Sequence, residues 1–146
     1  MSLSTSSPYS DRTWATASRT IGERTIGFRF IAELGGPRPP RQSVRVFVLW
    51  RFESADGMPD PVARERMDQL EELLAAHLEE DGFATLVIVS TGDGLREWTF
   101  YAESSDELLH RVNAALAGLP PFPLEIHEAD DPGWHYYGAF IAELAR

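Results

Sequence analysis

The order of its periodic segments is the feature of this sequence that most limits its fold. From residue 44 to residue 128 a strand-like segment is followed by a helical one, two strand-like ones, a second helical one and a last strand-like one. This β-α-β-β-α-β order is typical of a split βαβ unit. Because crossovers between parallel strands are right-handed, we expect both helices on one face of an antiparallel sheet. The order therefore predicts an α+β fold.

The first half of this unit has clear local signals. In residues 44–53 apolar side chains fall on both faces, with Val46 and Val48 on one and Phe47 and Leu49 on the other. We therefore expect a central strand that is covered on both sides. A helix capped by Asp60 should follow and end at Gly82. Its predicted buried stripe is Ala63, Met67, Leu70, Leu74 and Leu78.

The second half begins with two strands, residues 85–90 and 95–103, joined by a Gly-Asp-Gly turn that is typical of hairpins. Ser104 and Glu107 have the spacing of a capping box and predict a helix N-terminus. That helix should stop at Gly118 and be followed by a strand at residues 123–128. Its predicted buried residues are Leu108, Leu109, Val112, Ala115 and Leu116.

Two further elements flank the unit. Residues 12–19 and 24–33 alternate around Gly22, which predicts an N-terminal β-hairpin. Residues 132–145 predict a C-terminal helix whose stripe holds Trp134, Tyr137, Ile141 and Leu144. We therefore expect a flexible tail at residues 1–11 and a single α+β domain at residues 12–146. Its ferredoxin-like core would carry the hairpin and the short helix as additions.

The composition excludes several classes of function. The chain has no cysteine and no lysine, which excludes thiolate metal sites, cysteine nucleophiles and Schiff-base chemistry. Its net charge is −10. Residues 1–52 hold eight arginines and three acids, whereas residues 53–146 hold five arginines and twenty acids. Such an acidic surface would repel nucleic acid, so we expect instead a protein partner with a basic surface.

The sequence shows no membrane segment and no secretion signal. No apolar run approaches the roughly 20 residues that a membrane span needs. The first ten residues are polar and lack the apolar stretch of a signal peptide. Together with the lack of cysteine, this predicts a cytoplasmic protein.

Three residues at the last strand-to-helix junction are candidates for metal binding. His127, Asp131 and His135 recur every fourth residue, but Pro132 interrupts any helix through all three. A strand-end histidine and a helix histidine could still converge in space. Since the sequence contains no four-ligand zinc pattern, we favour surface histidines and predict neither metal nor cofactor.

Aromatic residues form the other candidate site. Trp98 lies on one face of its strand and Tyr101 on the other. One hypothesis is that the aromatic residues tether the C-terminal helix to the sheet, with Asp131 capping that helix. The other is a groove between sheet and helix that binds a ligand or a partner. The candidate binding residues are Arg96, Trp98, Tyr101, Asp131, Trp134 and Tyr137.

Three motifs carry a resemblance to a known family. They are Gly57-Met58-Pro59 before the first helix, the 91–94 turn running into residues 96–101, and residues 131–134 with Tyr137. In their order and spacing the chain resembles the bacterial domain-of-unknown-function 695 family over most of residues 12–144. The family has no established activity and implies no catalytic residues. More remotely, the architecture is similar to that of the ribonuclease E regulator B (RraB-like) proteins, acidic domains that bind and restrain a ribonuclease.

We therefore expect a non-enzymatic interaction or regulatory domain. The alternative is a small hydrolase or ligand-binding protein with a pocket beside the C-terminal helix, using His127, Asp131, His135 or Tyr101. A third possibility is a homodimer formed through Phe47 and Leu49 on the second face of the sheet.

Overall fold

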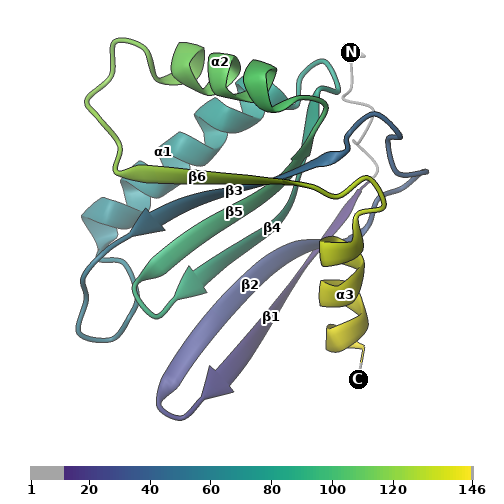
Figure 1. The fold of residues 1–146 in the computed structure, drawn as a ribbon. Helices are drawn as coiled ribbons and strands as arrows, with labels where there is room; N and C mark the ends of the chain where they lie inside the picture. The colour runs from purple at the N-terminus through teal and green to yellow at the C-terminus, as the bar shows by residue number, and fades with distance from the viewer. Residues whose placement is uncertain (1–11, 146) are drawn as a thin grey trace, which may run out of the picture.

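One sheet of six strands carries three helices in the computed structural model, which describes residues 12–145 (Figure 1). The predicted flexible tail, residues 1–11, lies outside the described residues. In chain order the elements are β1 (Thr13–Ile21), β2 (Arg24–Glu33), β3 (Val44–Arg51), α1 (Pro61–Leu78), β4 (Ala84–Gly92), β5 (Leu95–Ala102), α2 (Ser105–Leu116), β6 (Leu124–Asp130) and α3 (His135–Leu144).

The sheet is antiparallel throughout, in the order β1-β2-β4-β5-β3-β6. The predicted N-terminal hairpin is confirmed, and its turn residue Gly22 has φ +64°. Within residues 12–145, the strand pairing between the hairpin and the rest of the sheet runs through residues 27–30 of β2, which pair with residues 88–91 of β4. It therefore extends the sheet outward beyond β4. The fold is α+β, as predicted.

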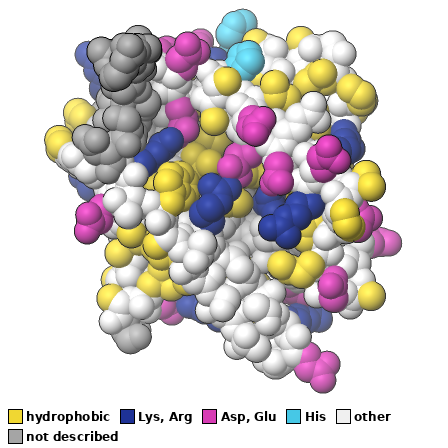
Figure 2. Space-filling model, turned by 180° about the vertical axis from the view of Figure 1, so that it is seen from behind, with side chains coloured by type: hydrophobic (Ala, Val, Ile, Leu, Met, Phe, Trp, Pro, Cys, Tyr) yellow, Lys and Arg dark blue, Asp and Glu magenta, His cyan; other side chains and the backbone are white. Residues whose placement is uncertain are grey.

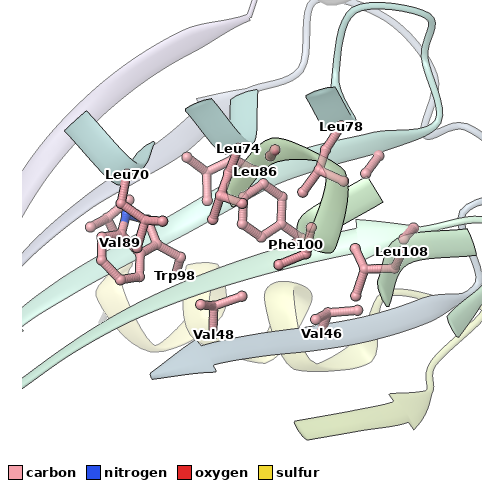
Figure 3. Close-up of a cluster of buried hydrophobic side chains, with 14 of the residues drawn as sticks. Val46, Val48, Leu70, Leu74, Leu78, Leu86, Val89, Trp98, Phe100 and Leu108 are labelled. Carbon is pink, nitrogen blue, oxygen red and sulfur yellow. The ribbon is translucent and has the colours of Figure 1, made fainter. Parts of the chain in front are cut away.

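Helices α1 and α2 cover one face of the sheet and enclose the larger core. Trp98 and Phe100 of β5 point into this core, as do Val46 and Val48 of β3 (Figure 3). The helices contribute the stripes that their periodicity predicts. These are Met67, Leu70, Leu74 and Leu78 of α1 and Leu108, Val112 and Ala115 of α2. Leu109, which we predicted to be buried, is 39 % exposed, because it lies about 100° around the helix from Leu108.

The opposite face carries a second, smaller core beneath α3. In Figure 3 this helix lies beyond the strands, on the side away from the labelled side chains. Phe30, Ile88 and Tyr101 of the sheet pack there with Trp134, which precedes the helix. Phe140 of α3 meets Phe28 and Phe30 edge to face. The predicted stripe of Trp134, Tyr137, Ile141 and Leu144 is the side that faces this cluster.

Two predicted helix boundaries are wrong. Helix α1 begins after the predicted cap Asp60, but it ends at Leu78 and not at Gly82. A turn follows, in which Gly82 has φ +80° and its amide donates to the carbonyl of Glu79. Helix α3 begins at His135 and not at Pro132. Trp134 has φ +55°, and this left-handed residue ends a turn that the residues before it form.

Strand β4 contains an irregularity that fixes the end of α1. The register with β5 shifts between Leu86 and Ile88, so the amide of Leu86 is available outside the ladder. It donates to the buried carboxylate of Glu79 over 2.8 Å. The same carboxylate accepts two bonds from Arg12, of 2.6 and 3.0 Å. These contacts attach the start of the hairpin to the C-terminal end of α1.

Candidate functional site

The six predicted site residues lie on opposite faces of the sheet. The side chains of Arg96 and Trp98 in β5 point toward α1. Tyr101 of the same strand points to the opposite face. Tyr101, Trp134 and Tyr137 belong to the cluster beneath α3, where Asp131 hydrogen-bonds to Tyr101. One groove holding all six is therefore excluded by the pleat of β5.

The α3-side residues bind one another. The ring of Tyr101 stacks on Trp134, whose indole nitrogen donates to the carbonyl of Gln42 over 2.8 Å. The Tyr101 hydroxyl donates to Asp131 over 2.7 Å and accepts from the amide of Tyr137. Asp131 also accepts from the amides of His135 and Tyr136, which are at the start of α3. These contacts attach α3 to the sheet. The polar groups of Tyr101, Trp134 and Asp131 thus bind partners within the chain.

The pKa values follow from this network. Burial tends to raise the pKa of Asp131, but the hydrogen bonds from Tyr101, Tyr136 and His135 outweigh it and hold the pKa below its usual value. Burial raises the pKa of Tyr101, and its hydrogen bond to the carboxylate raises it further. The carboxylate therefore stays charged and the phenol stays protonated at neutral pH, as a helix cap requires.

The three candidate metal ligands have separate environments. His127 is exposed and contacts Glu125 at 3.4 Å. Asp131 is buried, where it binds the start of α3. The ring of His135 lies against Gly133. Within residues 12–145 no group of three His, Cys, Asp or Glu side chains could hold a metal ion.

A pocket of about 340 Å³ lies on the α1 side, where the hairpin extends past the helix. Its wall on one side is formed by Arg64 and Asp68 of α1 and by Met58. Its floor and far wall come from β1, β2, β4 and β5, and Arg96 lies among these residues. We call it the hairpin pocket. Figure 2 shows the molecule from behind, where arginine and carboxylate side chains lie next to one another in the middle of the face.

Arg96 is the most unusual residue of the hairpin pocket. It is only 5 % exposed, and its Nε has no hydrogen-bond partner among the described residues. Its closest acid is Asp68, at 3.6 Å from Nη1. Burial lowers the pKa of Arg96, and the carboxylates of Asp68 and Glu71 oppose this effect. An arginine remains charged in a protein even so, so the pocket holds an incompletely paired cation.

The neighbouring Arg29 is already paired. Its Nη2 donates to both oxygens of Glu71, at 2.6 and 2.7 Å, and its guanidinium lies 5.1 Å from the ring of Trp14. Glu71 also accepts the indole N–H of Trp98 over 2.9 Å. This carboxylate is thus engaged by Arg29 and Trp98, so the acid that pairs with Arg96 is the exposed Asp68, at 3.6 Å.

Gly27 opens the floor of the hairpin pocket. It lies in β2 with ordinary strand geometry, and a Cβ placed on it would meet only the carbonyl of Thr91, at an unstrained 3.9 Å. A glycine inside a strand weakens the strand and often marks a place where another group approaches the backbone closely. Here the missing side chain leaves space beside Arg29 and Arg96.

Sequence reasoning identified Arg96 but missed its surroundings. Alternation along β2 already places Gly27 and Arg29 on the same face. An interior strand glycine beside an arginine was the available signal. The contribution of Arg64 and Asp68 depends on where α1 lies over the sheet, which no local pattern encodes.

A second hollow, of about 460 Å³, lies among the turns at the far end of the sheet. Its rim carries Glu53, Asp56 and Asp93, and Asp93 pairs with Arg24 at 3.0 Å. Hydrogen bonds from the Ser54 hydroxyl and the amide of Met58 hold the pKa of Asp56 below its usual value. This end of the molecule is therefore strongly acidic at neutral pH.

A family model described as a family of unknown function, DUF695, matches residues 12–142. The chain belongs to the DUF695 family. The resemblance that the three motifs predicted is thus confirmed, and the match includes the strands, α1 and most of α3. Comparisons of this DUF695 chain with curated proteins and with solved structures found no match. None of the helices described in residues 12–145 is long and apolar enough to cross a membrane.

Proposed function

We propose that this chain is a non-enzymatic binding domain that takes up a small organic anion in the hairpin pocket. The observation that supports this most strongly is Arg96, a buried guanidinium beside an open pocket with an Nε that lacks a partner. The carboxylate partner of Arg96, Asp68, lies 3.6 Å from Nη1 and is itself exposed. An anion in the pocket would pair with the terminal nitrogens of this guanidinium more closely than Asp68 does.

The chemistry of the pocket favours a negative group. Guanidinium groups bind carboxylates and phosphates through paired N–H donors. Arg64 contributes a second cation to the wall, and Thr91 lies directly opposite Arg96 in the register of β4 and β5. The volume of about 340 Å³ lies within the range of small-molecule sites.

A matched ligand series tests this proposal. Hexanoate and hexyl phosphate are compared with hexanol and hexylamine by isothermal titration calorimetry at neutral pH. We expect at least one anion to bind, and the alcohol and the amine to bind more weakly than that anion. R96M should abolish the binding, whereas R51M should not, because Arg51 is exposed and pairs with Glu125 outside the pocket. The proposal fails if no anion binds, or if R96M binds as well as the native chain.

The hydrolase alternative, with a pocket beside α3, is less well supported. It needs Tyr101 and Asp131 to be free to act on a substrate, but they bind each other and the start of α3. Incubation with a panel of ester and phosphoester substrates would support it only if turnover occurs and is lost in Y101F.

A basic protein partner is the second candidate function. The acidic rim around Glu53, Asp56 and Asp93 supports it, because complementary charge speeds association and selects partners. A regulatory, cytoplasmic role in a bacterium belongs to the same hypothesis. Its test is salt-sensitive capture of one defined partner, lost when these acids are replaced by their amides.

The second proposal concerns the architecture of the sheet. We propose that β3, α1, β4, β5, α2 and β6 form a ferredoxin-like unit to which the hairpin and α3 were added. The order β4-β5-β3-β6 within the sheet supports it. The more remote similarity to the RraB-like proteins has no further support. The homodimer hypothesis remains a proposal, and light scattering on a concentrated sample tests it.

A further inference from the structure

We infer that the ligand of the hairpin pocket is a monocarboxylate with a compact apolar body, in preference to a phosphate ester or a dicarboxylate. The inference rests on the proposed function and specifies the chemical class of its ligand. It follows from the charge of the pocket, from the start of α1 and from the side chains that would surround the body of the ligand.

The pocket offers approximately one positive charge. The charge of Arg29 is matched by Glu71, which binds it at 2.6 Å. Of the remaining groups, Arg64 and Arg96 are cations and Asp68 is an anion. A carboxylate carries one negative charge and balances this set. A phosphate monoester carries about −1.5 to −2 at neutral pH and would exceed it, in a chain whose net charge is −10.

The start of α1 is not arranged for phosphate. Phosphate sites often use the free amides of a helix N-terminus. Here Asp60 caps α1 and accepts from the amide of Ala63 over 2.7 Å. The cap therefore occupies a donor that a phosphate would use.

The rest of the pocket suits an apolar body. The apolar side chains on the α1 side of the pocket are Met58 and Val89. Ala17 and Phe28 also border it, but their side chains belong to the cluster beneath α3. Methionine adapts its shape to irregular ligands because it is unbranched and flexible. At the volume that one liquid water occupies, about 30 Å³, the pocket has room for roughly ten non-hydrogen atoms. The body is therefore small, of the size of a short or branched alkyl chain or one ring.

The experiment ranks the head groups on one six-carbon body. Hexanoate, hexyl phosphate and hexanedioate are titrated separately into the native chain by calorimetry. We expect hexanoate to bind most tightly, by about tenfold over either dianion, since the second charge lacks a partner. If hexyl phosphate or hexanedioate binds more tightly, the inference is overturned while the proposed function stands. If none of the three binds, the proposed function fails and the inference fails with it.

Two variants make the assignment specific to this pocket. D68N removes one negative charge from an exposed position on α1 and leaves the pocket with about two positive charges. It should shift the preference toward hexyl phosphate by about tenfold, and an unchanged preference would contradict the charge argument. G27V fills the floor of the pocket without straining the backbone. It should abolish hexanoate binding in a folded protein, and full binding by G27V would place the ligand elsewhere and overturn the inference.

Discussion

The ring of Tyr101 lies parallel to the indole of Trp134, with ring centroids 4.3 Å apart and an interplanar angle of 8°. One residue belongs to β5 and the other to the turn before α3. Below the stack the Tyr101 hydroxyl donates to Asp131 over 2.7 Å. The contact thus combines apolar area with a buried hydrogen bond, and it fixes where the C-terminal helix lies on the sheet.

Y101F should loosen this attachment. The change keeps the stacked ring, but removes the donor to Asp131 and the acceptor for the amide of Tyr137. We expect the free energy of unfolding to fall by about 1–3 kcal/mol, as measured by urea denaturation. Y136F is the control, since Tyr136 is 37 % exposed and its loss should cost less. Equal effects from both variants would contradict the role given to the Tyr101 hydroxyl.

D131N should remove a pH-dependent part of the stability. Hydrogen bonds hold the pKa of Asp131 in the folded chain below its usual value of 3.8. The folded state therefore binds this proton less readily than the unfolded state, and stability is gained above the usual value. This gain is lost as the pH falls through the lower folded pKa.

The measurement compares native chain and D131N by urea unfolding between about pH 6 and about pH 2. The native chain should be more stable at the upper end, and the difference should shrink toward the acid end. Acids elsewhere in the chain titrate in both proteins and cancel in the difference. A difference that does not change with pH would show that Asp131 contributes through its shape alone.

E79A should be one of the most destabilising single changes. It leaves Arg12 without its carboxylate and the buried amide of Leu86 without an acceptor. Removing one partner of a buried ion pair costs about 3–5 kcal/mol. Thermal unfolding is the measurement, and E80A on the exposed neighbouring position is the control. A small effect of E79A would mean that water replaces the carboxylate.

Substitution by valine should affect the stability of the chain differently at two strand glycines, Gly27 and Gly92. G27V adds a β-branched residue to a strand at a position with space, so we expect stability to be unchanged or higher by up to about 1 kcal/mol. G92V should destabilise the chain, since its Cβ would lie 2.5 Å from the carbonyl of Thr25 at a residue with φ +153°. Chemical denaturation of both variants checks this. Destabilisation by G27V would show that the hairpin pocket is filled or strained in the native chain.

R96M should cost little stability although Arg96 is buried. Methionine fills a similar volume and removes a charge with an unpaired Nε. Replacing a poorly paired buried charge by an apolar side chain is often neutral or stabilising by about 1–4 kcal/mol. We expect a free energy of unfolding equal to or above that of the native chain. A clear loss would identify Arg96 as a structural residue and weaken the proposed function.

The sequence predicted elements whose signals are local. At the β4–β5 hairpin, Asp93 and Gly94 both have positive φ, which the Gly-Asp-Gly motif favours. Ser104 caps α2 by accepting from the amide of Glu107. The Glu107 side chain, however, pairs with Arg111 one turn along, which is a competing local partner that the capping motif does not reveal.

The misplaced features depend on contacts between distant segments. The sequence pattern starts α3 too early because Trp134 adopts a left-handed conformation that tryptophan rarely takes. The stacking of Trp134 on Tyr101 offsets the energetic cost of this conformation. The hairpin pocket likewise depends on how far the hairpin extends beyond α1. Periodicity assigns each side chain to a face, but it does not say which faces are left uncovered.

The hairpin is held at both of its ends by ion pairs, although only a short part of β2 pairs with β4 in the described residues. Near the Gly22 turn Arg24 pairs with Asp93 of the β4–β5 turn at 3.0 Å, and at the start of the hairpin Arg12 pairs with Glu79 at 2.6 Å. The first pair is exposed, whereas the second is largely buried. Because dissolved salt screens exposed charges much more than buried ones, rising ionic strength should loosen the turn end of the hairpin before its start.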